Sequence, residues 1–216
     1  MKIIMKKLWI LVAATGTDFK LIFKMKRIVL LLFTSMLFLT ACDKAGNGDV
    51  VSQERMANDF NGIVIDGVAN VNVHSGEDYK VIVTTDINLQ SKVLVEVKNN
   101  VLYIGTKSIK SFKPTKLIVD VHLPELQSIN LKGVGNVKLS NGEASSLQIS
   151  LSGAGGIDAQ NYQVENVVIN HSGVGDAKIW VTTSLSGTLS GVGDIYYKGN
   201  PIINVSVSGV GKLKKL

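Results

Sequence analysis

"LSGVGDIYY", residues 189–197, is one copy of a short pattern that recurs through the second half of the chain. In most copies a Gly-x-Gly turn precedes a few residues in which apolar and polar side chains alternate. Repetition at a regular spacing indicates an architecture built from similar units placed side by side. The first glycines of five copies lie 20, 20, 18 and 18 residues apart, and the glycine pairs are Gly133 and Gly135, Gly153 and Gly155, Gly173 and Gly175, Gly191 and Gly193, and Gly209 and Gly211.

A repeat of this length restricts the fold. A unit of 18 to 20 residues is too short for a pair of helices and cannot bury a core alone. Runs of Val, Ile and Leu alternate with polar residues from Phe60 onward, without convincing helical periodicity. We therefore predict an all-β domain over residues 59–216, a parallel β-helix-like solenoid with one repeat per coil. Neighbouring coils would pair about 4.8 Å apart. A fainter copy begins at Ile65.

The glycines have a structural explanation in such a fold. A coil must turn a corner within a few residues, and neighbouring corners leave little room for a Cβ atom. The columns that begin at Leu131, Val137 and Leu139 stay largely apolar from copy to copy, so we expect them to face the core. His171 interrupts the first of these columns, where we expect a hydrogen-bonded histidine and neither a metal ligand nor a catalytic base.

The residues ahead of the repeats have the features of an export and anchoring signal. Lys26 and Arg27 precede an apolar stretch that is short for a membrane span and ends in Leu-Thr-Ala-Cys at Cys42. This ending resembles a bacterial lipobox, which implies cleavage before Cys42, the chain's only cysteine, and lipid attachment to its thiol. We assign residues 25–41 to a lipoprotein signal peptide, residues 42–58 to a flexible tether and residues 1–24 to an overextended start.

The formal net charge of +6 is concentrated in the leader. Residues 1–41 hold seven of the 23 basic residues and one acid, Asp18, so the rest of the chain carries 16 basic and 16 acidic residues. A neutral body produces no field that would steer it to a polyanion. We therefore expect no nucleic-acid partner.

Several stretches resemble a known family. They are the Ser-Gly-x-Gly corners, "FNGIVIDGVANVNV" (60–73), "LPEL" (123–126) and "GNPIINVSVSGVGKL" (199–213). Over about residues 59–213 the chain resembles the putative auto-transporter adhesin head GIN domain family. The resemblance implies a β-helix-like fold in an exported, often lipid-anchored bacterial protein that binds at a surface, and it names no ligand. Gly156 and Ala69 depart slightly from the repeated pattern.

A phosphate-binding loop is disfavoured. A dinucleotide fingerprint needs a third glycine, a helix after the turn and an acid further along the chain. Here strand-like residues follow the turn, and the turn occurs five times.

A metal site is also disfavoured. A calcium-binding β-roll needs an aspartate in every turn, and among the residues that follow the second glycine only Asp176 and Asp194 are acidic. His74, His122 and His171 share no helical or hairpin spacing typical of a metal site. We expect no cofactor and no metal.

Asp176 and Asp194 leave one catalytic alternative. One coil apart, they would be about 4.8 Å from each other at the backbone, and retaining glycosidases hold two carboxylates about 5–5.5 Å apart. The simpler interpretation is that each aspartate hydrogen-bonds its own turn, with Lys212 easing the repulsion between them. A carbohydrate-active enzyme is therefore less favoured than a binding module or an envelope scaffolding protein.

The residues most suggestive of binding are aromatic. Alternation places Trp180 and Tyr196 outward on neighbouring strands, as diagonal neighbours flanked by Lys178 and Lys198. Exposed aromatic rings beside cations suit a glycan or a protein partner, although such rings also shield sheet edges. These four residues form the candidate ligand patch.

The expected protein is thus a non-enzymatic, membrane-anchored lipoprotein of the cell envelope. We place it at the outer membrane, facing the periplasm or the cell surface. Its expected function is that of an adhesin or ligand-binding module. The alternative outside this class is an envelope scaffolding or maintenance protein with no external ligand.

Overall fold

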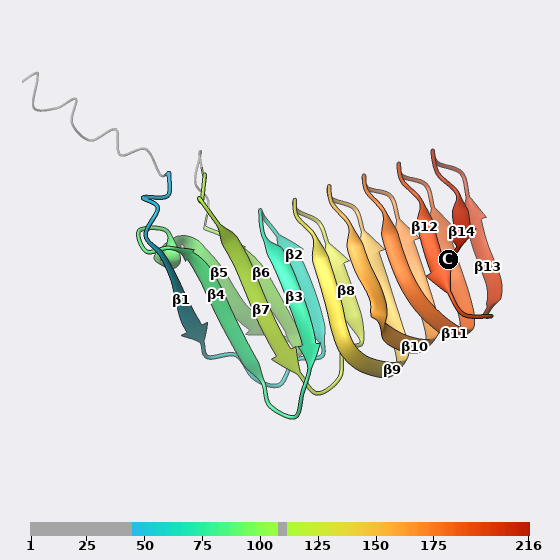
Figure 1. The fold of residues 1–216 in the computed structure, drawn as a ribbon, viewed down its shortest axis with the longest axis horizontal. Helices are drawn as coiled ribbons and strands as arrows, with labels where there is room; N and C mark the ends of the chain where they lie inside the picture. The colour runs from blue at the N-terminus through green and yellow to red at the C-terminus, as the bar shows by residue number, and fades with distance from the viewer. Residues whose placement is uncertain (1–44, 108–111) are drawn as a thin grey trace, which may run out of the picture. The chain divides into compact units, whose positions relative to one another are not determined.

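The computed structural model describes residues 45–107 and 112–216, and these residues confirm the predicted all-β class (Figure 1). The predicted signal peptide and Cys42 lie outside them. No α-helix occurs in the described part, and the only helical element there is the 3₁₀ turn η2 (Gln90–Lys92). The strands are β1 (Val50–Arg55), β2 (Gly62–Asp66), β3 (Asn70–Ser75), β4 (Lys80–Asp86), β5 (Val93–Lys98), β6 (Val101–Thr106), β7 (Leu117–Leu123), β8 (Ser128–Leu131), β9 (Val137–Leu151), β10 (Ile157–His171), β11 (Ala177–Leu189), β12 (Ile195–Lys198), β13 (Ile202–Val207) and β14 (Leu213–Lys215).

The strands form two layers because β9, β10 and β11 are long and contribute to both. Their first halves continue the order β1-β4-β7-β3-β9-β10-β11-β12-β14. Their second halves pair with β8 and β13, and β8 continues through β2 and β6 to β5. The pairing register shifts near Asn161, where β10 passes from one half to the other. A single core cluster draws its side chains from both layers.

Successive repeats pair in parallel, with a register of one repeat. Ile157 lies opposite Val137 on one side and Ala177 on the other. The fainter copy joins the same series, because Ile65 lies opposite Leu131. At the corners, the residue between the two glycines bridges to its counterpart in the next copy, in the order Val68, Val134, Ala154, Val174, Val192 and Val210.

The N-terminal half departs from the uniform parallel pattern. There β4 pairs antiparallel with β1 and β7, and β5 pairs antiparallel with β6. Residues 50–55, which the sequence assigns to a flexible tether, are strand β1. The Ser52 hydroxyl lies 2.8 Å from the Thr84 hydroxyl, and Arg55 donates to the carbonyl and side-chain oxygens of Gln90. Backbone pairing with β4 and these polar contacts therefore hold this strand, which has apolar residues only at Val50 and Val51 and no apolar–polar alternation that would mark it in the sequence.

The inward columns predicted from the repeats are buried. Leu131, Val137 and Leu139 are each at most 1% exposed. Burial decreases in the last copy, where Val207 is 46% exposed. An inner repeat is covered by its neighbours on both sides, whereas among the described residues no strand covers the outer side of β13.

The corner glycines lie where a side chain has no space. A Cβ atom on Gly193 would overlap the carbonyl oxygen of Gly175 in the preceding corner, and Gly193 also has a φ of 131°. Close backbone approach and a left-handed conformation both favour glycine.

We expect Gly193→Ala to lower the free energy of unfolding by about 2–4 kcal/mol, since it combines steric overlap with backbone strain. Chemical denaturation of the purified protein measures the change. Gly76→Ala is the matched control, because a Cβ atom there meets nothing within 4 Å, and its effect should stay within about 1 kcal/mol. Equal losses in the two variants would contradict the role given to the corner.

His171 is fully buried among the apolar columns. Its Nε2 lies 2.6 Å from the carbonyl oxygen of Gly175, which agrees with the expected hydrogen-bonded histidine. Its Nδ1 has no hydrogen-bond partner in the described structure. The paired strands place Leu151 and Leu189 opposite it, so the site is compatible with leucine.

Replacing His171 by leucine should therefore stabilise the domain. His171→Leu removes a buried polar atom without a partner, and we expect the free energy of unfolding to rise by about 1 kcal/mol. Thermal unfolding at neutral pH measures the effect, with Leu151→His as the converse variant, expected to destabilise. A lower melting temperature for His171→Leu would show that the Gly175 hydrogen bond outweighs the unpaired nitrogen.

Candidate functional site

The four residues of the candidate ligand patch lie together on β11 and β12. Lys178 is the register partner of Tyr196, and Trp180 is the register partner of Lys198. The two aromatic residues are therefore diagonal neighbours on adjacent parallel strands. Trp180 and Tyr196 are half-buried, while the alternating residues Ile179 and Ile195 point into the core.

Lysines lie close to both aromatic rings. The Lys198 Nζ is 3.7 Å from the centroid of the Trp180 ring, a close cation–π contact. The Lys214 Nζ lies 5.4 Å from the centroid of the Tyr196 ring. The Lys198 ammonium thus covers one face of the indole.

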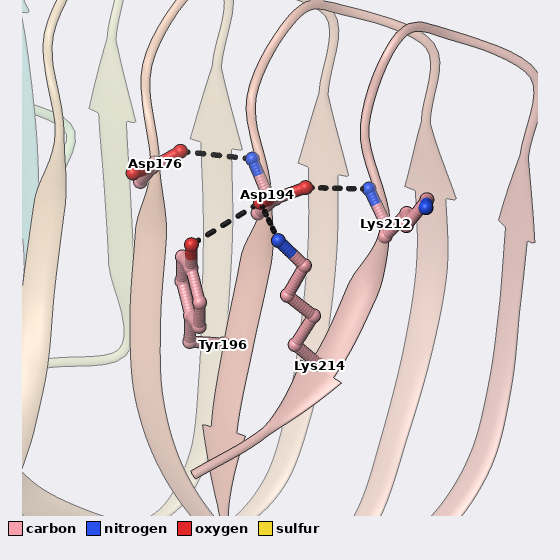
Figure 2. Close-up of polar contacts among 5 residues, drawn as sticks. All are labelled: Asp176, Asp194, Tyr196, Lys212 and Lys214. Atoms are coloured by element: carbon pink, nitrogen blue, oxygen red, sulfur yellow. Dashed lines mark hydrogen bonds and ion pairs between the residues drawn. The ribbon is translucent and has the colours of Figure 1, made fainter.

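Asp194 is the centre of a polar cluster beside the patch (Figure 2). It accepts hydrogen bonds from the Tyr196 hydroxyl at 3.1 Å and from the Lys212 backbone N–H at 2.7 Å, and it pairs with the Lys214 ammonium. Asp176 accepts the Asp194 backbone N–H at 2.9 Å. Each aspartate therefore caps the corner of the next repeat.

These contacts disfavour the glycosidase alternative. The hydrogen bond from Lys214, followed by that from the Lys212 backbone, holds the pKa of Asp194 below its usual value. The same contact with Asp194 raises the pKa of Lys214. A retaining glycosidase needs one carboxyl with a raised pKa and one ionised carboxylate that is free to attack. The lowered pKa excludes Asp194 as the acid, and its oxygens are already occupied by Tyr196, the Lys212 N–H and Lys214. The arrangement instead stabilises corners.

The aspartates belong to a longer ladder that sequence reasoning did not identify. The Asn70 side-chain oxygen accepts the Asn136 N–H, and the Asn136 side-chain oxygen accepts the Gly156 N–H, both at 2.9 Å. The column after the second glycine carries this signal, because Asn and Asp occupy most of its positions. The prediction that each aspartate bonds its own turn is wrong, since each side chain accepts from the corner of the next repeat. Gly156 has no side chain and so cannot supply a side-chain acceptor for the next corner.

A hollow of about 620 Å³ lies beside this gap in the ladder. Gly156 lines it together with the corners on either side, and Ala154 stands where most copies have valine. Lys178 borders the hollow and is also the register partner of Tyr196. The hollow and the candidate ligand patch therefore share a residue. Its polar and charged lining residues are Asn136, Lys138, Asp158, Asp176 and Lys178.

The structure also brings together two histidines that their sequence spacing does not relate. His74 on β3 and His122 on β7 are register partners, and their rings stack with centroids 4.9 Å apart. Burial, followed by the nearby charges of His74 and Lys80, lowers the pKa of His122. Across residues 45–107 and 112–216, no three His, Cys, Asp or Glu residues are grouped as metal ligands would be.

The part of the chain described in the structure has no helix long and apolar enough to cross a membrane.

Comparison with known proteins gives a family and a fold. A family model described as "Putative auto-transporter adhesin, head GIN domain" matches residues 59–141 and 130–201. A crystal structure of a putative adhesin from Bacteroides fragilis NCTC 9343 is 24% identical, covers 80% of this chain and 99% of its own, and superposes with a TM-score of 0.53. A putative lipid binding protein from Parabacteroides distasonis ATCC 8503 is 23% identical over 80% and 98% of the two chains, with a TM-score of 0.39. No curated protein matches the chain.

The pKa of Asp194 predicts an acid-sensitive final corner. The folded value lies below the unfolded value of about 3.9, so the ionised carboxylate stabilises this region above that pH. The contribution is lost as the pH falls through the lower folded pKa. Asp194→Asn can still accept from Lys212 but cannot form the ion pair with Lys214.

We therefore expect the variant's Lys212 amide to exchange faster than the wild-type amide at neutral pH. Its protection factor should also fall less than that of the wild type on acidification. Hydrogen exchange followed by NMR measures both effects. A variant with the wild-type response to acid would contradict the proposed role of the ion pair.

Proposed function

Because the chain belongs to the putative auto-transporter adhesin head GIN domain family, we propose that it is a non-enzymatic, lipid-anchored binding module of the cell envelope. Cys42 would carry the lipid, and the β-domain would present the candidate ligand patch. The family description supports an adhesin-like role at the cell surface or envelope. The lipobox-like sequence before Cys42 supports the anchor.

We assign the repeats to successive coils of a parallel β-solenoid. The support is the register of one repeat between β9, β10 and β11, together with the corner bridges from Val68 to Val210. In this assignment β1, β4 and β5 are antiparallel additions to the N-terminal coils. A solenoid suits a binding module, because side chains from successive coils line up on one extended face.

The observation that carries the binding proposal is the contact of Lys198 with the Trp180 ring, next to Tyr196 and the hollow. An indole ring can stack against the apolar face of a sugar, and Lys198 can release the ring to pair with a carboxylate on the same ligand. Lys178 adds a second cation at the border of the hollow. The hollow is lined by as many aspartates as lysines, so the preference for charge rests on Lys198. The patch therefore suits a surface glycan that presents a carboxylate to Lys198.

Substitution of the aromatic side chains tests the proposed function. Trp180→Ala and Tyr196→Ala should each weaken glycan binding by about tenfold or more, as expected for aromatic side chains at the centre of a binding surface. A glycan array probed with the purified full-length protein in detergent would identify ligands, and titration of the best ligand would measure affinity.

Tyr103→Ala is the matched control, since Tyr103 is also a half-buried tyrosine but belongs to β6 in the other layer. It should bind as the wild type does. Unchanged binding by a folded Trp180→Ala, Tyr196→Ala double variant would exclude this patch. Two results together would favour the scaffolding function. The glycan array would show no ligand, and the protein on intact cells would resist protease added from outside.

A further inference from the structure

The outer rim of the corners carries an exposed apolar line. We call it the valine ridge, and it consists of the residues between the paired glycines and their counterpart in the fainter copy. Its valines are 46–72% exposed although each is flanked by tightly packed backbone. The corner bridges hold the ridge straight over six copies, or about 24 Å. Its members are Val68, Val134, Ala154, Val174, Val192 and Val210.

A basic cluster borders the N-terminal end of the valine ridge. Lys116 lines one hollow together with Val68 and Val134, so the segment that carries it adjoins the ridge. Lys113 lies three residues before Lys116, and both are exposed, so these two lysines form the basic cluster. Among the described residues, no salt bridge involves Lys113 or Lys116.

The proposed lipid anchor enters the domain beside this cluster. Ala45 bridges to Lys113, and the Gly46 N–H donates to the Lys113 carbonyl at 2.8 Å. Only two residues, Asp43 and Lys44, separate Cys42 from Ala45, which limits the separation of the Cys42 and Ala45 Cα atoms to about 11 Å. A lipid on Cys42 would therefore hold the basic cluster at the bilayer surface.

A buried carboxylate fixes the N-terminal segment to the loop. Asp86 accepts the Gly48 N–H and the Thr115 N–H, both at 2.8 Å. Burial opposes its ionisation, but hydrogen bonds from Thr115 and Gly48 outweigh burial and hold its pKa below the usual value. The segment that follows the proposed anchor is thus pinned to the basic cluster.

The opposite rim differs in charge. The bends of β9–β11 lie at the far end of the strands from the corners, roughly 20 Å away (Figure 1). Glu125, Glu143 and Glu165 gather around one hollow there. An anionic membrane would repel that rim and attract the basic cluster.

We propose that the valine ridge and the basic cluster form a membrane-docking edge on which the domain lies against the bilayer beside its lipid anchor. The proposal rests on the lipidation of Cys42 in the proposed function. The valines insert at the level of the headgroups, and the lysines contact anionic lipids. Three acids flank the ridge. Asp176 caps the next corner and Asp194 is paired with Lys214. Asp66 is exposed next to Gly67, and Lys132 holds the same position in the following copy, so this copy pair adds no net negative charge.

The test uses the full-length lipoprotein reconstituted into phosphatidylethanolamine vesicles, with and without phosphatidylglycerol. Mass spectrometry first establishes the lipid on Cys42, so failure of the anchor is detected separately. Val192→Cys then carries an environment-sensitive fluorophore at the ridge, and Ser145→Cys carries the same label at the opposite rim. The probe for membrane contact is quenching by lipid that bears a nitroxide near the headgroup.

We expect nitroxide lipid to quench the Val192 label and not the Ser145 label. Lys113→Glu with Lys116→Glu should lose the additional quenching that phosphatidylglycerol produces. Both residues are exposed, so these changes should not affect folding. With lipidation established, equal and weak quenching at both positions would overturn the proposal. A Val192 label shielded from aqueous iodide but not quenched by lipid would also overturn it and would assign the ridge to contact with a second copy.

Discussion

The structure depends on close contact between backbone atoms at the corners. At Gly173, Gly191 and Gly209, an added Cβ atom would overlap the carbonyl oxygen of the glycine one repeat earlier. Only a residue without a side chain permits this close contact between backbones of successive corners. The contact sets the pairing register of the strands that follow each corner. Once this register is set, the backbone hydrogen bonds and the apolar columns of neighbouring repeats are aligned as well. One steric condition, repeated along the chain, therefore organises the whole repeat region.

The same corners position the candidate functional groups. Asp194 follows the second glycine of its corner, so its carboxylate reaches the next backbone N–H, and Tyr196 and Lys214 gather around it. Two residues beyond Tyr196, Lys198 reaches the Trp180 ring. Where the ladder loses its side chain at Gly156, a hollow opens beside the patch. The repeat thus provides a regular framework, and departures from it distinguish one part of the surface from the rest.

Two surfaces with different chemistry result from this framework. The rim of the corners carries valines and, at the end near Cys42, lysines. The outward face of β11 and β12 carries aromatic rings in contact with lysine ammonium groups. If the rim lies on a bilayer, the outward face extends away from it, and the patch begins only a few residues from the corner. With only two residues between Cys42 and Ala45, the docking edge would set the orientation of the binding face, since a linker this short has little freedom.

The sequence alone determined the all-β class, the repeat and the need for glycine at the corners, because steric crowding and side-chain alternation act over a few residues and recur at a regular spacing. It also placed Trp180 and Tyr196 as diagonal neighbours, since the repeat length sets which residues face each other. Only the tertiary structure decided that residues 50–55 form an edge strand, that His74 meets His122, and that Asn136 caps the corner of Gly156. The β1 pairing and the His74–His122 contact join segments that are not copies of the repeat. The Asn136 side chain bonds a backbone N–H of the next repeat, and the position of that N–H depends on how the two corners stack. A hydrophobic pattern in the sequence indicates which side chains are buried. Which strand or polar group pairs with which depends on the sheet edges and N–H groups that remain unpaired in the folded chain.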